Sequence, residues 1–275
     1  MVSEIIVNQL LQSFASAPLT LFFQVITFFG HPLPWLFIAA WLFWLHKEKK
    51  SFMLVSLILF AGFVSGALKL IIARPRPEGL LVFEKPMTEF SLPSGHSTLA
   101  GTVFGFFETK VFPKEKLLLL TLALLTALSR LYLGVHFLSD VLAGLLIGYL
   151  IGKGALLVEK KVAKSHLHIS KIREEGLLVL LFIIIIGTTL LLPEELYSAQ
   201  ALFGYFFGFA FYRHTSLGEK RTHNKKLSLT AGTIILAIIG FFAFSFTGLK
   251  SQSLFFLAGF FISFIWPLVV AKAKM

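Results

Sequence analysis

The fold is decided by three polar segments that interrupt long apolar runs: KLIIARPRP at residues 69–77, PSGH at 93–96 and SRLYLGVHFLSD at 129–140. They place cations and histidines in a chain that is otherwise poor in charge. A charge buried within a membrane is costly and is usually kept for function. We therefore expect the apolar runs to be membrane helices and the three segments to meet in one site.

The composition indicates a membrane protein. The chain has 275 residues, of which 56% are hydrophobic and 14% charged, whereas an ordinary soluble domain has about 25% charged residues. Its mean hydropathy is +0.84. Cysteine is absent, which excludes disulfides, thiol nucleophiles and cysteine-bound metals.

The apolar runs predict an all-α, polytopic transmembrane helical bundle with nine crossings, of which all but the short first one are close to the roughly 20 residues that cross a bilayer core. A catalytic core at residues 1–158 contributes about five spans, and an extension at residues 159–275 contributes four. Gly144, Gly148 and Gly152 are spaced by four and predict a face that packs against a neighbouring helix. The predicted spans are 33–45, 51–72, 95–112, 117–133, 137–158, 176–192, 197–213, 228–247 and 253–270.

The N-terminal region is expected to lie at the outer membrane interface. Residues 3–17 predict a short amphipathic helix, because apolar side chains recur there at helical spacing. Residues 19–45 contain a turn signal, Gly-His-Pro at 30–32. They form either one tilted span or, as we favour, an interfacial helix followed by a short span.

The net charge of +11 reflects membrane topology, so we expect no nucleic-acid partner. Of the 25 Lys and Arg residues, 19 fall in five segments that the predicted spans place on one side: 46–50, 110–116, 153–173, 213–226 and 272–274. Such an excess marks the cytoplasmic side. The N-terminus is then outside the cell membrane, the C-terminus is cytoplasmic, and all three motif segments are extracytoplasmic.

The first motif segment supplies cations for a phosphate. Lys69 and Arg76 are seven residues apart, which is two helical turns, so both are expected on one face where the span ends. Pro75 and Pro77 end the helix. Arg74 is only two residues from Arg76 and is expected to point elsewhere.

The second segment, PSGH, predicts an anion site at the start of the next helix. Pro93 and Ser94 suit a helix start, and Gly95 lets a ligand approach the backbone. Free N–H groups at a helix N-terminus bind anions, and Ser94 adds a hydroxyl. His96 stands beside the same point.

The third segment predicts the reacting group. Asp140 follows His136 by one helical turn, so its carboxylate can accept the Nδ1 proton and leave Nε2 free. His136 is then the nucleophile. His96 protonates the leaving oxygen and later takes a proton from water. Arg130 completes the set of cations that holds the phosphate and stabilises its transition state.

A metal ion is the competing interpretation for His96, His136 and Asp140. Three permanent cations nearby would repel a divalent ion, so we expect neither a metal nor another cofactor. The remaining histidines fall in predicted turns or loops and are expected to be structural or solvated; they are His31, His46, His166, His168, His214 and His223.

The spacings K-x6-RP, PSGH and SR-x5-H-x3-D resemble those of the type 2 phosphatidic acid phosphatase (PAP2) or lipid phosphate phosphatase family, which shares its site with vanadium haloperoxidases. The resemblance covers residues 20–158 without departure at any motif position. It implies a metal-independent phosphatase with the same residues in the same roles. The nine-span arrangement with an outer N-terminus is similar to that of glucose-6-phosphatase and the sphingosine-phosphate phosphatases.

We therefore expect a phosphatase for a lipid phosphate or diphosphate. A polyprenyl diphosphate is the first candidate, and phosphatidate or phosphatidylglycerophosphate is the second. The alternative is a small soluble ester such as a sugar phosphate. A vanadate-dependent haloperoxidase and a transporter or non-catalytic scaffold are weaker alternatives. The sequence leaves the oligomeric state and the role of the C-terminal spans open.

Overall fold

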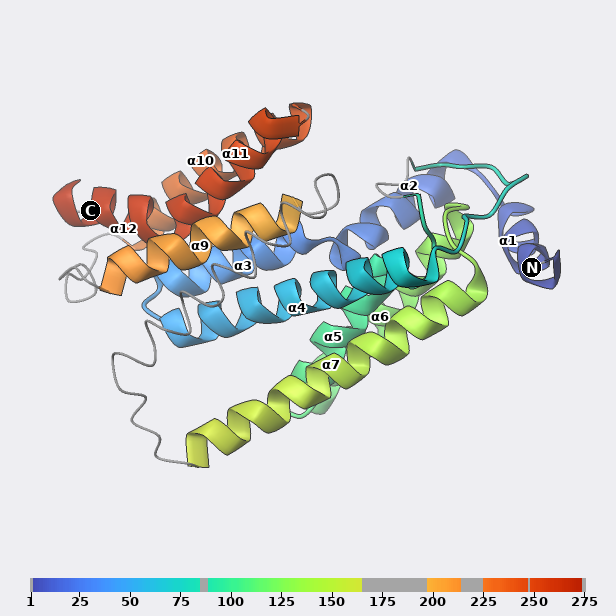
Figure 1. Ribbon diagram of the computed structural model, residues 1–275, viewed down its shortest axis with the longest axis horizontal. Coiled ribbons are helices and arrows are strands. Elements are labelled where there is room, and N and C mark those ends of the chain that lie inside the picture. The colour runs from blue at the N-terminus through green and yellow to red at the C-terminus, as the bar shows by residue number, and fades with distance from the viewer. Residues whose placement is uncertain (1, 85–88, 165–196, 214–224, 247, 274–275) are drawn as a thin grey trace. The chain divides into compact units, whose positions relative to one another are not determined.

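A computed structural model describes residues 2–84, 89–164, 197–213, 225–246 and 248–273, and every regular element in these ranges is a helix (Figure 1). The chain forms two compact units. The first comprises Met1–Trp35 and Leu57–His166, and the second comprises Leu36–Ser56 and Leu167–Met275. The predicted all-α class is confirmed, whereas the predicted domain boundary at residue 158 stays a prediction.

The first unit holds the three motifs. Its helix starts follow from local sequence: Ser94 caps α5, and Pro113 stands at the start of α6, where its missing N–H costs no hydrogen bond. The predicted N-terminal helix is present, but it ends at Gln12 because Ser16 and Pro18 begin the next one. The helices and helix parts of this unit are α1 (Val2–Gln12), α2 (Ala17–Thr27), the 3-10 turn η1 (Phe28–Gly30), the start of α3 (Pro32–Trp44), the C-terminal part of α4 (Glu48–Ile72), α5 (Gly95–Phe107), α6 (Pro113–Tyr132) and α7 (Leu138–Lys164).

Glycines allow α5 and α7 to pack with their backbones close together (Figure 1). A Cβ atom added at Gly144 would lie 2.7 Å from the carbonyl oxygen of Ser94. One added at Gly148 would collide with the carbonyl oxygen of Thr98. The predicted small-residue face of residues 144–152 is therefore confirmed, and it fixes the start of α5 against the start of α7.

We expect Gly148→Ala to lower the thermal unfolding midpoint in detergent by several degrees, because the added methyl group forces these backbones apart. Overpacking of this kind costs about 1–3 kcal/mol. Gly154→Ala on the same helix is the matched control, since a Cβ there meets nothing within 4 Å. Equal midpoints for the two variants would contradict the packing argument.

The C-terminal end of α6 is held by an aromatic core. Tyr132 and Phe23 have ring centroids 4.6 Å apart, and the Tyr132 hydroxyl lies 2.8 Å from Oγ1 of Thr20. Leu133 and Val135 are buried in the same cluster. This packing fixes both the last turn of α6 and the loop that leads from it to α7.

Three described helical segments are long and apolar enough to cross a membrane: Glu48–Ile72, Leu138–Lys161 and Ser253–Lys272. The pair Ala17–Gly30 and Pro32–Trp44 also qualifies, but it is bent by 50° at the predicted turn. This bend is compatible with both interpretations of residues 19–45. The chain is a multi-pass membrane protein, and the count of nine crossings stays a prediction.

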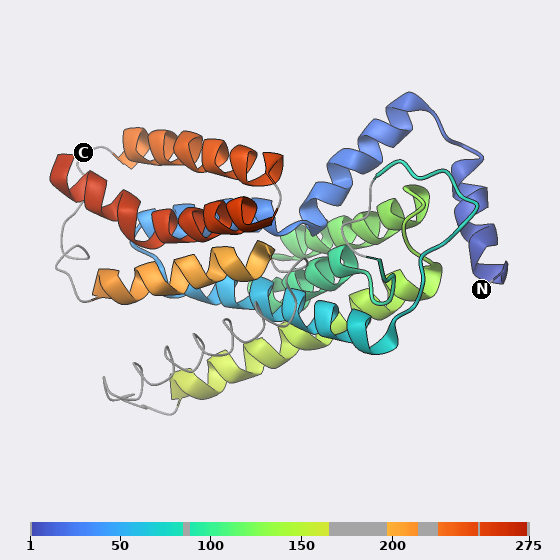
Figure 2. The ribbon, with the colours of Figure 1, turned by 45° about the horizontal axis from the view of Figure 1, so that its top comes forward.

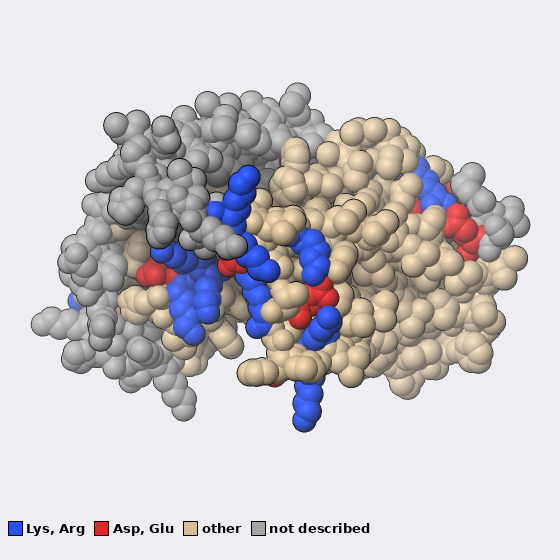
Figure 3. Space-filling model, turned by 90° about the horizontal axis from the view of Figure 1, so that it is seen from below, with Lys and Arg blue, Asp and Glu red and all other residues tan. Residues whose placement is uncertain are grey.

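The outward surface of α7 fits contact with lipid. Leu142, Leu146 and Leu150 are each more than half exposed and lie on the side of α7 that does not pack against α5. In the face drawn in Figure 3, the charged side chains of the described residues gather in few places and leave broad uncharged stretches. Such a surface would be costly in water and is suited to a bilayer.

Helix α5 is shorter than the predicted span 95–112, because it ends at Phe107. Glu108 follows it and pairs with Lys116 at 3.3 Å and also with Lys153. Hydrogen bonding to Lys153 holds the pKa of the Glu108 carboxyl below its ordinary value. The helix therefore stops where the chain meets a polar cluster, five residues before the end of the predicted span.

The second unit packs through aromatic side chains and close backbone contacts. Helices α9 and α11 lie side by side (Figures 1 and 2), and Gly204 and Gly259 leave no room for a Cβ between them. Trp44 anchors the end of α3 to this unit by donating from Nε1 to the carbonyl oxygen of Ile262 at 2.9 Å. The predicted span 176–192 lies outside the described residues. Besides most of α3 and the start of α4, the described helices of this unit are α9 (Tyr197–Arg213), α10 (Lys225–Ser245), α11 (Gly248–Phe260), the π-helical turn η3 (Phe261–Ile265) and α12 (Trp266–Ala273).

Candidate active site

The first motif runs from the last turn of α4 into the segment that follows. Lys69 is buried, and its Nζ donates to the carbonyl oxygen of Phe90 at 2.7 Å. The helix ends before Ala73, which adopts a left-handed backbone with φ 49°. Arg76 therefore reaches the site from a non-helical segment, and not from a helix face shared with Lys69 as its spacing predicted. The cause is Pro75, which disfavours a helical residue before it.

Arg76 and Asp140 flank the imidazole of His136 on opposite nitrogens. The guanidinium of Arg76 lies 3.4 Å from Nε2 of His136 and donates to the carbonyl oxygen of Val135 at 2.7 Å. Nδ1 of His136 lies 3.5 Å from a carboxylate oxygen of Asp140. His136 is only 3% exposed. The Asp140 carboxylate thus lies on the Nδ1 side of the ring and the Arg76 guanidinium on the Nε2 side, but Nδ1 makes no hydrogen bond to a described residue. The predicted donation from Nδ1 to Asp140 stays a prediction.

Asp140 is fully buried and is held by a residue that the sequence did not assign to the site. Arg74 donates to one Asp140 carboxylate oxygen at 2.7 Å and to Oγ of Ser139 at 2.6 Å, while its guanidinium lies over the ring of Phe137. The backbone N–H of Phe137 donates to the other oxygen at 2.8 Å. Arg74 thus holds the Asp140 carboxylate on the Nδ1 side of His136, and Arg76 lies on the opposite, Nε2, side.

The second motif begins α5. Ser94 is the N-cap: its hydroxyl accepts from the backbone N–H of Ser97 at 3.4 Å and from that residue's hydroxyl at 3.0 Å. The Ser94 backbone N–H donates to the carbonyl oxygen of Asp140 at 3.0 Å, which ties the second motif to the third. A Cβ at Gly95 would stand 3.5 Å from Oγ of Ser65, one turn before Lys69 on α4. Phosphate binding by Ser94 and Gly95 stays a prediction.

Arg130 ends α6 as a buried cation that already contacts a carboxylate. Its guanidinium donates to Oε2 of Glu84 at 2.7 Å and to Oγ1 of Thr27 at 2.6 Å. The sequence did not single out Glu84, which lies in an apolar stretch between motifs. The Nε–H of Arg130 is buried without a hydrogen-bond partner among the described residues. Arg130 therefore keeps a donor for an anion.

His96 stands beside a third histidine. The rings of His31 and His96 have centroids 6.0 Å apart, and a Cβ at Gly30 would lie 2.8 Å from Cβ of His96. The sequence assigned His31 only to a turn. Its proximity to His96 follows from the close contact of the turn around Gly30 with α5.

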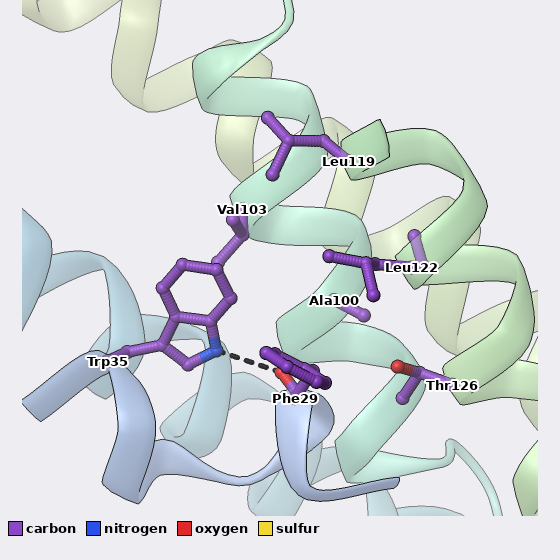
Figure 4. A pocket seen from close by; sticks show the side chains of 8 residues that line it. Phe29, Trp35, Ala100, Val103, Leu119, Leu122 and Thr126 are labelled. Atoms are coloured by element: carbon purple, nitrogen blue, oxygen red, sulfur yellow. Dashed lines mark hydrogen bonds between the residues drawn. The ribbon is translucent and has the colours of Figure 1, made fainter. Parts of the chain in front are cut away.

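An apolar pocket begins one helical turn from the site (Figure 4). Ala100 follows His96 by four residues on α5, and Thr126 precedes Arg130 by four on α6. Trp35 donates from Nε1 to the carbonyl oxygen of Phe29 at 2.9 Å and closes one side. The lining residues are Phe29, Trp35, Ala100, Val103, Leu119, Leu122, Ala123 and Thr126.

The surroundings of His136 favour its neutral form. Burial, followed by the positive charges of Arg130, Lys69 and Arg76, lowers the pKa of His136 well below its ordinary value. A nucleophilic imidazole must be unprotonated at Nε2. Because protonation requires a pH below the lowered pKa, the neutral form of His136 persists under mildly acidic conditions.

We therefore expect His136 to remain neutral at pH 6.5, where an ordinary histidine is about half protonated. The measurement is an NMR titration of protein labelled with ¹⁵N-histidine in detergent, with His136→Ala to assign the resonance. A midpoint at or above pH 6.5 would contradict the expectation. Free histidine, titrated in the same buffer, gives the midpoint of a fully solvated imidazole for comparison.

The described part of the chain gathers no three His, Asp or Glu side chains in the way that a metal ion would need. The prediction that the site uses no metal stays a prediction. The fold and the site define a multi-pass helical membrane protein with buried cations and histidines near one another.

The segment that carries the motifs is similar to known proteins. Residues 50–164 match the family model described as the PAP2 superfamily. The Lipid A 1-phosphatase of Rhizobium etli is 34% identical over 107 residues, which cover 34% of this chain and 44% of that protein. Phosphatidylglycerophosphatase B of Bacillus subtilis is 34% identical over 125 residues, which cover 42% of this chain and 60% of that protein. The chain thus spans about half the length of these relatives.

Solved structures agree at the level of the fold. The transmembrane PAP2 type phosphatidylglycerolphosphate phosphatase from Bacillus subtilis superposes with a TM-score of 0.53 and 24% identity over 60% of this chain and 88% of that chain. Residues 50–164, which carry all three motifs, are therefore similar to the PAP2 superfamily. The resemblance predicted from the three spacings is confirmed.

Proposed function

We propose that the chain is an integral membrane phosphatase that hydrolyses a lipid phosphate or diphosphate at the extracytoplasmic face through a phosphohistidine intermediate. One observation carries the proposal: Nε2 of His136 faces the guanidinium of Arg76 at 3.4 Å, with Asp140 on the opposite nitrogen. This is the geometry of an oriented nucleophile beside a phosphate-binding cation. Both relatives named above are lipid phosphatases, which supports the same activity here.

The residues divide the reaction into two displacements. The cations Lys69, Arg76 and Arg130 hold the phosphoryl oxygens. Nε2 of His136 forms a bond to phosphorus while the bond to the lipid oxygen breaks, and His96 gives that oxygen a proton. Water then attacks the phosphohistidine, His96 takes a proton from it, and inorganic phosphate leaves.

Two buried donors support phosphate as the bound group. The Nε–H of Arg130 and the hydroxyl of Ser65 have no hydrogen-bond partner among the described residues. Buried polar groups are nearly always hydrogen-bonded, so a ligand oxygen would satisfy them. Ser65 stands beside Gly95, where a phosphate could approach the start of α5.

The apolar pocket does not itself separate a lipid from a sugar. Its volume is about 10 Å³, which has room for about one water molecule and not for an acyl or prenyl chain (Figure 4). The lipid assignment is supported instead by the two lipid phosphatases to which the chain is similar.

The distribution of basic residues supports the extracytoplasmic placement. Of 25 Lys and Arg residues, 19 fall on the side opposite the motifs in the nine-span arrangement. Lys and Arg concentrate in cytoplasmic loops. A protease or impermeant label applied to intact cells, with a tag at either terminus, measures this orientation.

The activity is tested by phosphate release from the purified protein. The panel contains phosphatidate, phosphatidylglycerophosphate, a polyprenyl diphosphate, a lipid A 1-phosphate and glucose 6-phosphate, with and without EDTA. We expect hydrolysis of at least one lipid, unaffected by EDTA. Hydrolysis of the sugar phosphate alone would overturn the lipid assignment, and loss of activity in EDTA would overturn the mechanism.

A further inference from the structure

Helix α1 presents a polar face to the active site. Glu4, Asn8 and Gln12 are spaced by four residues, so they lie one above another on the same side of the helix. All three make hydrogen bonds to the segments that carry the motifs. Figures 1 and 2 both show α1 beside the loop between α6 and α7 and beside the segment that follows α4.

Asn8 holds the loop that carries the nucleophile. It is fully buried, and its side-chain amide donates to the carbonyl oxygens of Leu131 and His136, both at 2.9 Å. The two acceptors lie at the two ends of the loop. Because both N–H donors of this single amide are used, Asn8 fixes the distance between the end of α6 and His136.

Gln12 and Glu4 extend the same contact on either side of Asn8. The Gln12 amide donates to the carbonyl oxygens of Leu81 at 2.7 Å and Tyr132 at 2.9 Å, and it accepts from the backbone N–H of Leu81 at 3.1 Å. The Glu4 carboxylate accepts from Ser139 and from Arg74.

Glu4 is charged under ordinary conditions. Burial alone would raise the pKa of its carboxyl, but hydrogen bonds from Ser139 and Arg74 hold the pKa below its ordinary value. Glu4 and Asp140 therefore share Arg74, which joins α1 to the carboxylate behind His136.

The other side of α1 is apolar and exposed. Ile6 and Leu10 are 58% and 62% exposed, and Phe14, just beyond the end of the helix, is 70% exposed. These positions are also spaced by four. Helix α1 is too short to span a bilayer, and a short helix with one apolar face lies in the interface with that face among the lipids.

We propose that α1 is a positioning helix that couples the active site to the bilayer: its polar face holds the nucleophile loop, and its apolar face keeps the helix seated in the membrane interface. The inference rests on the proposed function only in taking His136 as the nucleophile. Asn8 acts through the backbone of His136 and is a positioning residue, not a catalytic one.

The first test separates kcat from KM for Asn8→Ala in lipid vesicles of phosphatidylcholine and phosphatidylglycerol, with the lipid phosphate that the panel identifies. We expect kcat to fall at least tenfold and KM to change less than threefold, because the cations remain in place while Nε2 of His136 loses its alignment. Gln9→Ala, which removes an exposed amide from the same helix, is the matched control and should keep the activity of the unchanged protein. Equal kcat values for the two variants would overturn the positioning role.

The second test locates the apolar face. Because the chain has no cysteine, the variant Leu10→Cys can be labelled with a nitroxide at this position alone. We expect this label to be relaxed more strongly by oxygen, which enters lipid, than by a water-soluble nickel chelate. The reverse is expected for Gln9→Cys, about 100° further round the helix. A water-exposed label at Leu10 would overturn the membrane seating.

The third test asks whether the apolar face of α1 affects catalysis. Replacing Ile6, Leu10 and Phe14 together by Ser should lower kcat in vesicles about tenfold while the substitutions touch no motif residue. Unchanged activity would overturn the coupling. An unchanged protein that hydrolyses none of the panel would instead refute the proposed function, so the two failures are distinct. If the triple variant does not fold, the single labels still decide the seating of α1.

Discussion

Replacing His136 by Ala should reduce phosphate release by several orders of magnitude, which is the largest effect that we expect in this chain. The variant lacks the atom that forms the bond to phosphorus, whereas Lys69, Arg76 and Arg130 still hold the phosphate. Removing a nucleophile of this kind leaves only the catalysis that the binding groups supply. Initial rates with the lipid phosphate, measured to the limit of detection, give the ratio.

Two controls separate lost chemistry from lost folding in His136→Ala. Inorganic phosphate should still protect the variant against thermal unfolding, since the cations are unchanged. The unchanged enzyme, quenched in acid-free denaturant after mixing with ³²P-labelled substrate, should carry an alkali-stable, acid-labile label that the variant lacks. A His136→Ala protein within tenfold of the unchanged rate would remove His136 as the nucleophile.

The second large effect is expected from Arg130→Ala. Loss of one preorganised donor to a transition-state oxyanion typically lowers kcat by about 10²–10³-fold, and here the loss also leaves the Glu84 carboxylate facing the site without its cation. We therefore expect kcat/KM for the lipid phosphate to fall by at least a thousandfold, about 4 kcal/mol. Arg130→Lys should recover little, because an ammonium that keeps the two contacts of Nη1 to Glu84 and Thr27 has no second nitrogen, such as Nε of Arg130, to donate to the phosphate.

A double-variant cycle identifies the part that Glu84 plays. In Arg130→Ala combined with Glu84→Gln, the repulsion between Glu84 and the phosphate is absent. Substrate affinity should therefore recover by about tenfold relative to Arg130→Ala alone. If the effects of the two substitutions simply add, Glu84 does not face the bound phosphate. An Arg130→Ala protein within tenfold of the unchanged kcat/KM would contradict the role of Arg130.

The helical membrane class and the PAP2 resemblance could be predicted from the sequence, because each depends on a pattern of residues that are close together in the chain. An apolar run of about 20 residues needs no partner to be recognised. A glycine every fourth residue, as at Gly148, marks a helix face whatever helix it meets. The contact between Asp140 and the imidazole of His136 spans one helical turn, so its residues are close in sequence as well as in space.

The contacts made by residues outside the motifs could not be predicted in this way. Arg74 and Arg76 are neighbours of the same type, and only the left-handed turn at Ala73 and the packing of α7 direct one to Asp140 and the other to His136. Glu84 meets Arg130 across 46 residues, and His31 meets His96 through the close approach at Gly30. The local sequence around Glu84 or His31 does not indicate which residue each of them contacts.

Helix α1 illustrates the difference between what could be predicted from the sequence and what required the structure. An amphipathic helix near the N-terminus could be predicted without the structure, because apolar positions recur there at helical spacing. A polar stripe such as Glu4, Asn8 and Gln12 usually faces water, and only the tertiary structure turned it onto the loop of His136, 128 residues away from Asn8. The physical reason is that helix formation depends on neighbouring residues, whereas the choice of what a helix face contacts depends on packing across the whole chain.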